Sequence, residues 1–194
     1  EGDYSQLEFR VAGYLSQDPV IYEEVESGFD VHSYTAEIMG VSRQDAKAHT
    51  FKPLYGGVLG TNREMAYYSA FRNKYQGVTQ WHDKLQEEAV TKKTVTLPSG
   101  REYAFPYAKY TRYGTTVGAT SIKNYPVQGF ATADLLPLAL IRLHKCLKAM
   151  VKPKPQSRII NTVHDSIIMD VHTKEKNTMI ELLKRSMLCI PEEC

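Results

Sequence analysis

The sequence predicts an α+β fold, in which many short helices accompany a few strands that pair across long stretches of chain. Two observations lead to this prediction. Capping residues and helical spacing mark one segment after another over the first two thirds of the 194 residues. From about residue 94 the pattern changes, and short β-rich runs alternate with helical segments.

The composition is that of an ordinary globular protein. Hydrophobic residues make up 42% and charged residues 24%, and the formal net charge of +2 neither requires nor excludes a nucleic-acid partner. Three cysteines without CxxC spacing favour reduced thiols of an intracellular protein over disulfides or zinc: Cys146, Cys189 and Cys194. The sequence contains no apolar run of about 18 residues, the length that a membrane-spanning helix needs. It begins with Glu, so we expect a piece of a longer protein.

Capping signals locate the helices in the first half of the chain. Ser5 and Glu8 form a capping box in front of an amphipathic run. Asp30 is suited to cap a helix over residues 31–39, because the following Gly40 can close it in the left-handed conformation. The other helical segments of this half are expected at residues 19–28, at 61–75 behind a second capping box of Thr61 and Glu64, and around 81–85.

One helix, expected from Ser42 onward, carries an unusual stripe. Four side chains recur at every fourth residue and so share one side of the helix: Arg43, Lys47, Phe51 and Tyr55. A core helix would present only apolar residues on that side. A basic pair alone indicates a solvated face and two rings alone indicate an edge of the core, but together they favour a site for a nucleotide, which is anionic and flat. Pro53 is expected to kink or end this helix.

The second half of the chain contains the predicted strands. Residues 94–97 and 101–105 indicate a hairpin, and residues 158–163 and 166–171 indicate a second one around His164 and Asp165. A long helix is expected from about residue 126 to 151, bent at Pro137. A last helix, at about 174–188, is expected to bury four apolar side chains: Met179, Leu182, Leu183 and Met187.

Two aspartates could carry chemistry. Asp165 lies at the tip of the second hairpin and Asp3 lies just ahead of the first helix, and each alone is more simply a turn or capping residue. If the terminal segments pair in one sheet, the two carboxylates meet and can hold two divalent cations about 3.5–4 Å apart, the arrangement used for phosphoryl transfer. Magnesium suits such oxygen ligands.

Four segments, in this order, resemble motifs of the DNA polymerase I family, the family A DNA polymerases. The segment 3-DYSQLEFR-10 resembles motif A, the stripe from Arg43 to Gly56 resembles the fingers helix of motif B, 124-NYPVQG-129 is similar to a segment that touches the primer–template, and 163-VHD-165 resembles motif C. The likeness covers essentially the whole chain.

The resemblance implies a role for each matching residue. Asp3 and Asp165, with the carbonyl of Tyr4, would bind two Mg²⁺ ions, for which Mn²⁺ can substitute, and Lys47 would protonate the leaving pyrophosphate. The residues implied to bind the nucleotide are His32, Arg43, Lys47, Phe51, Tyr55, Glu8 and Gln6. Those implied to lie along the DNA are Asn124, Gln128 and His164. Glu8 would favour deoxynucleotides, and Phe51 in place of Tyr would discriminate against nucleotides that lack the 3′-hydroxyl.

The family also implies a domain plan. An antiparallel palm sheet would carry the catalytic carboxylates, with a mostly helical fingers subdomain inserted: palm at 1–17, fingers with a connecting hairpin at 18–117 (motif B helix 43–55), and palm again at 118–194. A thumb and an exonuclease domain are expected upstream and are absent from this sequence. Expected partners are primer–template DNA, dNTPs and the missing part of the parent chain. The expected location is the cytoplasm, of a host cell if the protein is viral, or an organelle.

Some positions depart from the family pattern. Ser166 follows Asp165 where the family usually has Glu, which leaves one carboxylate fewer near the metals, and Thr120 stands where many relatives carry Arg. The short interval between His32 and Arg43 resembles phage-type replicative members.

The segment 101-REYAFPYAKYTRYG-114 alternates basic and aromatic residues. This pattern suits a template-side surface, with Arg101 and Arg112 on the DNA backbone, and equally suits simple strand packing. The sequence therefore predicts a DNA-templated DNA polymerase core. Two alternatives stay open: a nucleic-acid- and nucleotide-binding fragment that is inactive without its thumb, and a single-subunit RNA polymerase, against which Glu8 argues.

Overall fold

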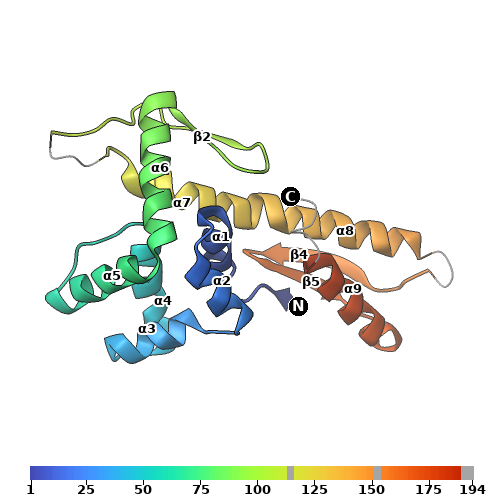
Figure 1. Ribbon diagram of the computed structural model, residues 1–194. Helices are drawn as coiled ribbons and strands as arrows, with labels where there is room; N and C mark the ends of the chain where they lie inside the picture. The colour runs from blue at the N-terminus through green and yellow to red at the C-terminus, as the bar shows by residue number, and fades with distance from the viewer. Residues whose placement is uncertain (113–115, 151–153, 189–194) are drawn as a thin grey trace. The chain divides into compact units, whose positions relative to one another are not determined.

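The computed structural model describes residues 1–112, 116–150 and 154–188 and confirms an α+β fold (Figure 1). The chain forms two compact units, one made of Glu1–Leu7 with Gln128–Cys194 and the other of Glu8–Val127. The domain plan expected from the sequence, with boundaries at 17/18 and 117/118, stays a prediction. In the described part of the chain, no helix has the length and apolar character needed to cross a bilayer.

The first unit contains a three-stranded antiparallel sheet in the order β1 (Gly2–Asp3), β5 (Ser166–Asp170), β4 (Arg158–Val163). Strands β4 and β5 are the predicted hairpin, and the N-terminal strand joins it through the pair Asp3 and Ser166. Position 2 favours glycine, because a Cβ there would lie 2.7 Å from Cδ2 of Leu183. The expected pairing of the terminal segments is thus confirmed.

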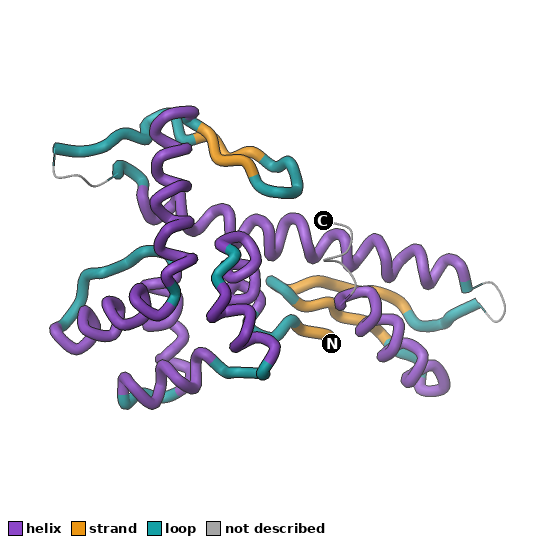
Figure 2. Tube along the Cα trace, in the orientation of Figure 1, coloured by secondary structure: helices purple, strands orange, loops and turns teal. Residues whose placement is uncertain are grey.

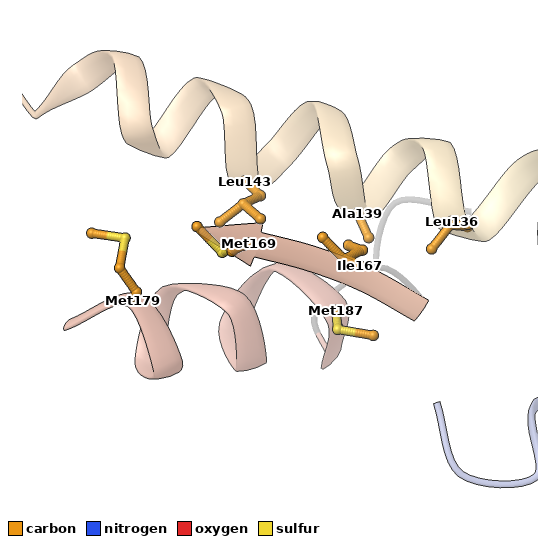
Figure 3. Packing of buried hydrophobic residues seen from close by; sticks show 7 residues of the cluster. All are labelled: Leu136, Ala139, Leu143, Ile167, Met169, Met179 and Met187. Carbon is orange, nitrogen blue, oxygen red and sulfur yellow. The ribbon is translucent and has the colours of Figure 1, made fainter. Parts of the chain in front are cut away.

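Two helices cover one face of this sheet. Alternate β5 residues, Ile167 and Met169, face a core to which α8 (Leu136–Ala149) and α9 (Lys176–Leu188) both contribute (Figure 3). Of the four residues expected to be buried by the last helix, Met179 and Met187 are buried, and Leu182 and Leu183 pack at the edge of the core. The short 3₁₀ segment η2 (Thr173–Glu175) leads into α9.

The long helix before the second hairpin begins earlier than predicted. Helix α7 (Ala119–Gln128) contains Pro126 in its interior, and a π-helical segment, η1 (Gly129–Leu135), connects it to α8. The prediction was wrong because it took Pro126 as a start signal. The bend expected at Pro137 is replaced by the π-helical segment just before it. Pro137 itself lies in the first turn of α8, where its missing amide N–H is tolerated.

The second unit is mostly helical. Its first six helices are α1 (Leu7–Ser16), α2 (Pro19–Glu26), α3 (Val31–Met39), α4 (Arg43–Leu54), α5 (Asn62–Lys74) and α6 (Gln76–Lys92). The caps predicted at Asp30, Ser42 and Thr61 are all present, and Thr61 and Glu64 form a complete capping box. Gly40 closes α3 in the left-handed conformation, as expected.

One buried aspartate joins two of these helices. Asp18 is fully buried and accepts hydrogen bonds through Oδ1 from the amides of Val20 and Ile21, at the start of α2. Its Oδ2 accepts from the amide of Val78, at the start of α6. Gly77 allows this approach, because a Cβ at that position would lie 2.8 Å from the Asp18 backbone. A single carboxylate therefore caps two helix N-termini.

The predicted hairpin around Pro98 is also present. Strands β2 (Thr94–Thr96) and β3 (Glu102–Ala104) pair antiparallel and form a second, two-stranded sheet (Figure 2). The hairpin packs on α6 and α7 through a small apolar cluster of Leu85, Ala89, Val95, Ala108 and Ile122.

Candidate active site

The sheet of the first unit brings the two predicted catalytic aspartates together. Asp3 is paired with Ser166, so it lies directly beside the residue that precedes Ser166, which is Asp165. Asp165 follows His164 in the tight turn of the β4–β5 hairpin, where His164 has a left-handed φ of 54°. Left-handed backbone is uncommon for a residue other than glycine. Side chains 162 positions apart in sequence thus meet through backbone pairing.

The electrostatics of this pair reflect their proximity. Burial raises the pKa of Asp165, and the charge of the neighbouring Asp3 carboxylate and a side-chain hydrogen bond with it raise it further. Two carboxylates this close repel each other when both are ionised, and a divalent cation between them removes that repulsion. The donor set fits a hard cation, but among the described residues no third His, Cys, Asp or Glu joins the pair.

The neighbours of the aspartates anchor the backbone. The hydroxyl of Tyr4 donates a 2.8 Å hydrogen bond to the carbonyl of Met187 in α9, and burial raises the pKa of this phenol to about 12. Ser166 is buried, and its hydroxyl donates to the carbonyl of Val163 across the hairpin. Ser166 therefore closes the turn of the hairpin.

Helix α4 of the second unit carries the predicted cationic and aromatic stripe. Ser42 caps its start by accepting from the amide of Asp45, and the helix ends at Leu54, one residue after Pro53, as predicted. Gly56 follows in the left-handed conformation with φ 76°, and its amide and that of Gly57 donate to the carbonyls of Pro53 and Lys52. This is a Schellman motif, which fixes the end of the helix.

A buried histidine also holds the end of α4. A ring N–H of His82 in α6 donates to the backbone of Leu54, while its Nε2 has no hydrogen-bond partner among the described residues. Burial lowers the pKa of His82 to about 3, with the charge of Lys123 contributing, so this histidine is neutral.

Arg43, at the first turn of α4, is held by a residue of α3. Its Nε donates a 2.8 Å hydrogen bond to Oδ2 of Asp30, whose Oδ1 caps α3 through the amides of His32 and Ser33. Burial works to raise the pKa of Asp30, but the hydrogen bonds from Arg43 and Ser33 and the Arg43 charge outweigh it and hold that pKa well below its usual range. Asp30 therefore fixes both the helix that carries His32 and the guanidinium of Arg43.

His32 is oriented by a chain of buried hydroxyl groups. Its Nδ1 lies 3.2 Å from Oγ1 of Thr50, which in turn donates to Oγ1 of Thr35 at 2.9 Å. Thr35 shares a further 2.6 Å hydrogen bond with the hydroxyl of Tyr67 in α5. Burial lowers the pKa of His32, and the nearby charges of Arg43 and Lys47 lower it further, against the opposing charge of Asp30. The chain links α3, α4 and α5.

The aromatic end of the stripe is ordered by ring contacts. The ring of Phe51 meets that of His32 edge-on at a centroid distance of 5.3 Å and stacks on that of Tyr55 at 6.1 Å with an interplanar angle of 19°. Five of the predicted nucleotide-binding residues therefore form one patch in the second unit, which we call the α4 patch: His32, Arg43, Lys47, Phe51 and Tyr55.

The other predicted residues lie elsewhere. Glu8 is in the first turn of α1, and Gln6 precedes that helix with a left-handed φ of 53°. Asn124 and Gln128 belong to α7, and Tyr125 between them contacts the rings of Tyr103 and Phe105 from the β2–β3 hairpin. Arg101 and Arg112 are both exposed.

Sequence reasoning missed four residues that shape the α4 patch. Asp30 was recognised only as a cap, and its second bond, to Arg43, depends on how α3 packs on α4. The hydroxyl chain was not foreseen at all: it consists of Thr35, Thr50 and Tyr67. Two threonines on facing helices give no local signal, because their partners lie 15 to 32 residues away in sequence.

Comparison with known proteins yields a consistent set of relatives. A model of DNA polymerase family A matches residues 1–192. The chain is 32% identical over 206 residues to DNA polymerase I of Lactococcus lactis subsp. cremoris, covering 95% of this chain and 23% of that protein. To DNA polymerase I of Aquifex aeolicus it is 28% identical over 212 residues, covering 95% of this chain and 34% of that protein.

A solved structure shares the fold. It is described as the POL domain of Pol1 from M. smegmatis in complex with DNA primer-template and dNTP, and it superposes with a TM-score of 0.79 at 24% identity, over 95% of this chain and 35% of that one. The chain thus spans between about a quarter and a third of the length of the proteins it matches.

Proposed function

The chain belongs to DNA polymerase family A, and from that premise we propose that it carries a polymerase active site and adds deoxynucleotides to the 3′-hydroxyl of a primer under the direction of a DNA template. The observation that carries this proposal is the convergence of Asp3 on β1 with Asp165 in the turn before β5. The electrostatic coupling of the two carboxylates supports a site for divalent cations rather than a pair of turn residues.

Asp3 and Asp165, with the Tyr4 carbonyl as a third oxygen, would hold magnesium. When bound there, the metal would supply charge neutralisation at the reacting phosphate. The protein's part is to keep the two carboxylates together, which the antiparallel pairing of β1 with β5 does through backbone hydrogen bonds. The tether from Tyr4 to α9 adds a second restraint on the same segment.

The α4 patch is proposed to bind the incoming nucleotide. With the Arg43 Nε held by Asp30, the two terminal nitrogens of the guanidinium remain as parallel donors for phosphate oxygens. Lys47, one turn further along, would neutralise the triphosphate and give a proton to the pyrophosphate as it leaves. Phe51 and Tyr55 would stack on the sugar and base, with Glu8 setting the preference for deoxyribose.

The decisive experiment is a magnesium-dependent primer-extension assay on Asp165→Asn, with Asp170→Asn as the matched control. Asp170 ends β5, the strand that directly follows Asp165, and is exposed. Losing several kcal/mol of charge stabilisation corresponds to a rate loss of about a thousandfold or more. We expect that loss for Asp165→Asn with retained DNA binding, and a rate near wild type for Asp170→Asn. Equal rates for the two variants would refute the assignment.

A second candidate function follows from the length of the chain. Because it spans only 23% of its Lactococcus relative, it can be a part that binds template and nucleotide but turns over only within a longer protein. Testing Asp165→Asn in the longer parent separates the two cases. The second function predicts that the parent is active, that the 194-residue chain is not, and that Asp165→Asn abolishes the activity of the parent. The aspartate pair would then be the active site, but the 194-residue chain would not turn over by itself.

A further inference from the structure

The first unit contains a second candidate site, an open cavity of about 550 Å³ between the end of α8 and the start of β4. Three cations border it: Lys148 from α8, Lys154 from the segment before β4, and Arg158 at the first position of β4. Three apolar side chains, Leu147, Met150 and Ile159, also line it and belong to the edge of the core cluster.

This cavity is separate from the aspartate pair. Arg158 begins β4, and Asp165 lies beyond the other end of that strand. Six residues of extended chain span about 20 Å, so the cavity and the two carboxylates lie at opposite ends of one hairpin. Figure 1 shows this end of β4 beside the C-terminal end of α8. The cavity is therefore distinct from the proposed metal site.

The charge of the segment is concentrated. Residues 144–158 contain five Lys and Arg and no Asp or Glu, a formal charge of +5, so the rest of the chain sums to −3 against a total of +2. One of the five, Lys152, falls outside the described residues. Lys148 is explained in part by its place in the last turn of α8, where a cation complements the helix dipole. Lys154 and Arg158 have no such explanation.

The cavity cations have no acidic partners within the described part of the chain. None of the ion pairs found there includes Lys148, Lys154 or Arg158. Asp170 is paired with Arg158 in the strand register, but no ion pair joins these two described residues. These side chains therefore present a positive surface that the described fold leaves uncompensated.

Hydrogen bonds hold the backbone of the cavity wall that carries Lys154 and Arg158. The carboxylate of Glu175 accepts hydrogen bonds from the amides of Gln156 and Ser157, at 3.0 and 2.9 Å, and from the Ser157 hydroxyl at 2.6 Å. The amide of His172 donates to the same hydroxyl at 3.0 Å. The Glu175 carboxylate is thus occupied in holding the backbone of this wall, and it forms no ion pair with the cavity cations among the described residues.

We propose that this cavity binds an acidic peptide segment that carries a large apolar side chain. Carboxylates of the peptide would pair with Lys148, Lys154 and Arg158, and the apolar side chain would cover Leu147, Met150 and Ile159. A nucleic-acid backbone would use the cations but leave the apolar lining exposed, as would a free phosphate ion, so the combination favours a peptide. Such a peptide would belong to a second protein that attaches to the polymerase away from its active site.

The test uses the 194-residue chain and a fluorescein-labelled peptide of sequence Asp-Asp-Phe-Asp-Asp, measured by fluorescence anisotropy at low salt. The variants are Lys148→Glu and Arg158→Glu, with Lys145→Glu as the matched control, since Lys145 is an exposed cation of the same helix that does not line the cavity. We expect each cavity variant to lose about tenfold or more in affinity and the control to lose less than about twofold. Replacing Phe by Ala in the peptide should weaken binding about tenfold.

Three results would overturn the proposal. Equal losses for Lys145→Glu and Arg158→Glu would mean diffuse charge attraction without a site. An oligo-dT strand that binds more tightly than the peptide and is lost in the same variants would make the surface a nucleic-acid contact. No binding of the peptide at all would leave the cavity without its proposed ligand. Circular dichroism checks the fold of each variant, and the exposed Lys148 provides a test even if Arg158→Glu unfolds.

Discussion

The aspartate pair and the α4 patch place their charged side chains in different ways. Asp3 and Asp165 are brought together by the backbone ladder of a sheet, and their positions depend on strand register. Arg43 and His32 are placed by other side chains, namely the Asp30 carboxylate and the buried threonine hydroxyls. We expect the first arrangement to tolerate changes in neighbouring side chains. In the second, the loss of any one side-chain hydrogen bond is expected to release the group that it orients. Four sets of substitutions test this difference.

The largest expected effect is a separation of activity from stability at Asp3. Asp3→Asn should lower primer extension about a thousandfold or more, because it removes one of the two carboxylates proposed to bind the metal. Its melting temperature should stay the same or rise, since the substitution removes the repulsion that raises the pKa of Asp165. A large fall in melting temperature would show that the two carboxylates stabilise the sheet, which would contradict the view that backbone pairing alone positions them. Thermal denaturation followed by circular dichroism measures it.

The next effect concerns acid stability of the α4 region. His82 has its pKa lowered to about 3 in the folded state, below the unfolded value of about 6.5. The unfolded chain therefore binds more protons, and stability falls as the pH falls below about 6.5. Over two pH units, from about 6.5 to 4.5, this loss is at most about 2.7 kcal/mol.

His82→Leu should flatten this dependence. Urea denaturation at several pH values between about 4.5 and 6.5 measures the free energy of unfolding of both proteins. His32, whose pKa burial also lowers, is expected to leave a smaller slope in the variant. An unchanged slope in His82→Leu would place the acid sensitivity elsewhere.

A smaller effect is expected from cutting the hydroxyl chain. Thr50→Val keeps the shape of the side chain but removes the hydroxyl that joins His32 to Thr35. Leaving buried polar groups unpaired costs about 1–3 kcal/mol, so unfolding free energy should fall by that amount and activity should fall with it. Thr50→Ser, which keeps the hydroxyl, is the control. If both variants behave alike, the chain of hydroxyls does not orient His32.

The smallest effect separates the two roles of Asp30. Asp30→Ser retains a good helix cap but loses the partner of Arg43, while Asp30→Ala loses both. We expect Asp30→Ser to keep its stability and to raise the KM for dNTPs about tenfold, because the proposed contact of Arg43 with the phosphates needs an oriented guanidinium. Asp30→Ala should show the same rise and lose a further ~1 kcal/mol of stability. Equal KM values for Asp30→Ser and the wild type would assign Asp30 to capping alone.

Local signals in the sequence were sufficient for much of the fold. Caps at Asp30, Ser42 and Thr61 and the hairpin tip at Asp165 were predicted because each depends on residues within about four positions. The pairing of β1 with β5 could only be stated as a condition, since nothing local connects residues 3 and 165. Sequence patterns could not predict the π segment at 129–135, because Pro126 before it and Pro137 after it gave conflicting signals.

The candidate site was predictable to a different degree in its two regions. The stripe on α4 and the two aspartates were visible as patterns, while His32 entered only through the resemblance to a family. What orients these groups, such as the contact of Asp30 with Arg43, arises from helix packing and has no sequence pattern of its own. Residues that position others are therefore the ones that sequence reasoning is least able to find.

The carboxylate shared by α2 and α6 has a topological consequence. The amide of Val78 lies 60 positions beyond Asp18, and the chain between them contains α3, α4 and α5. This segment therefore begins and ends at the same carboxylate. The α4 patch lies entirely within this segment, and two contacts join the ends of the segment: the Asp18 carboxylate with the Val78 amide, and the Tyr75 hydroxyl with Glu24.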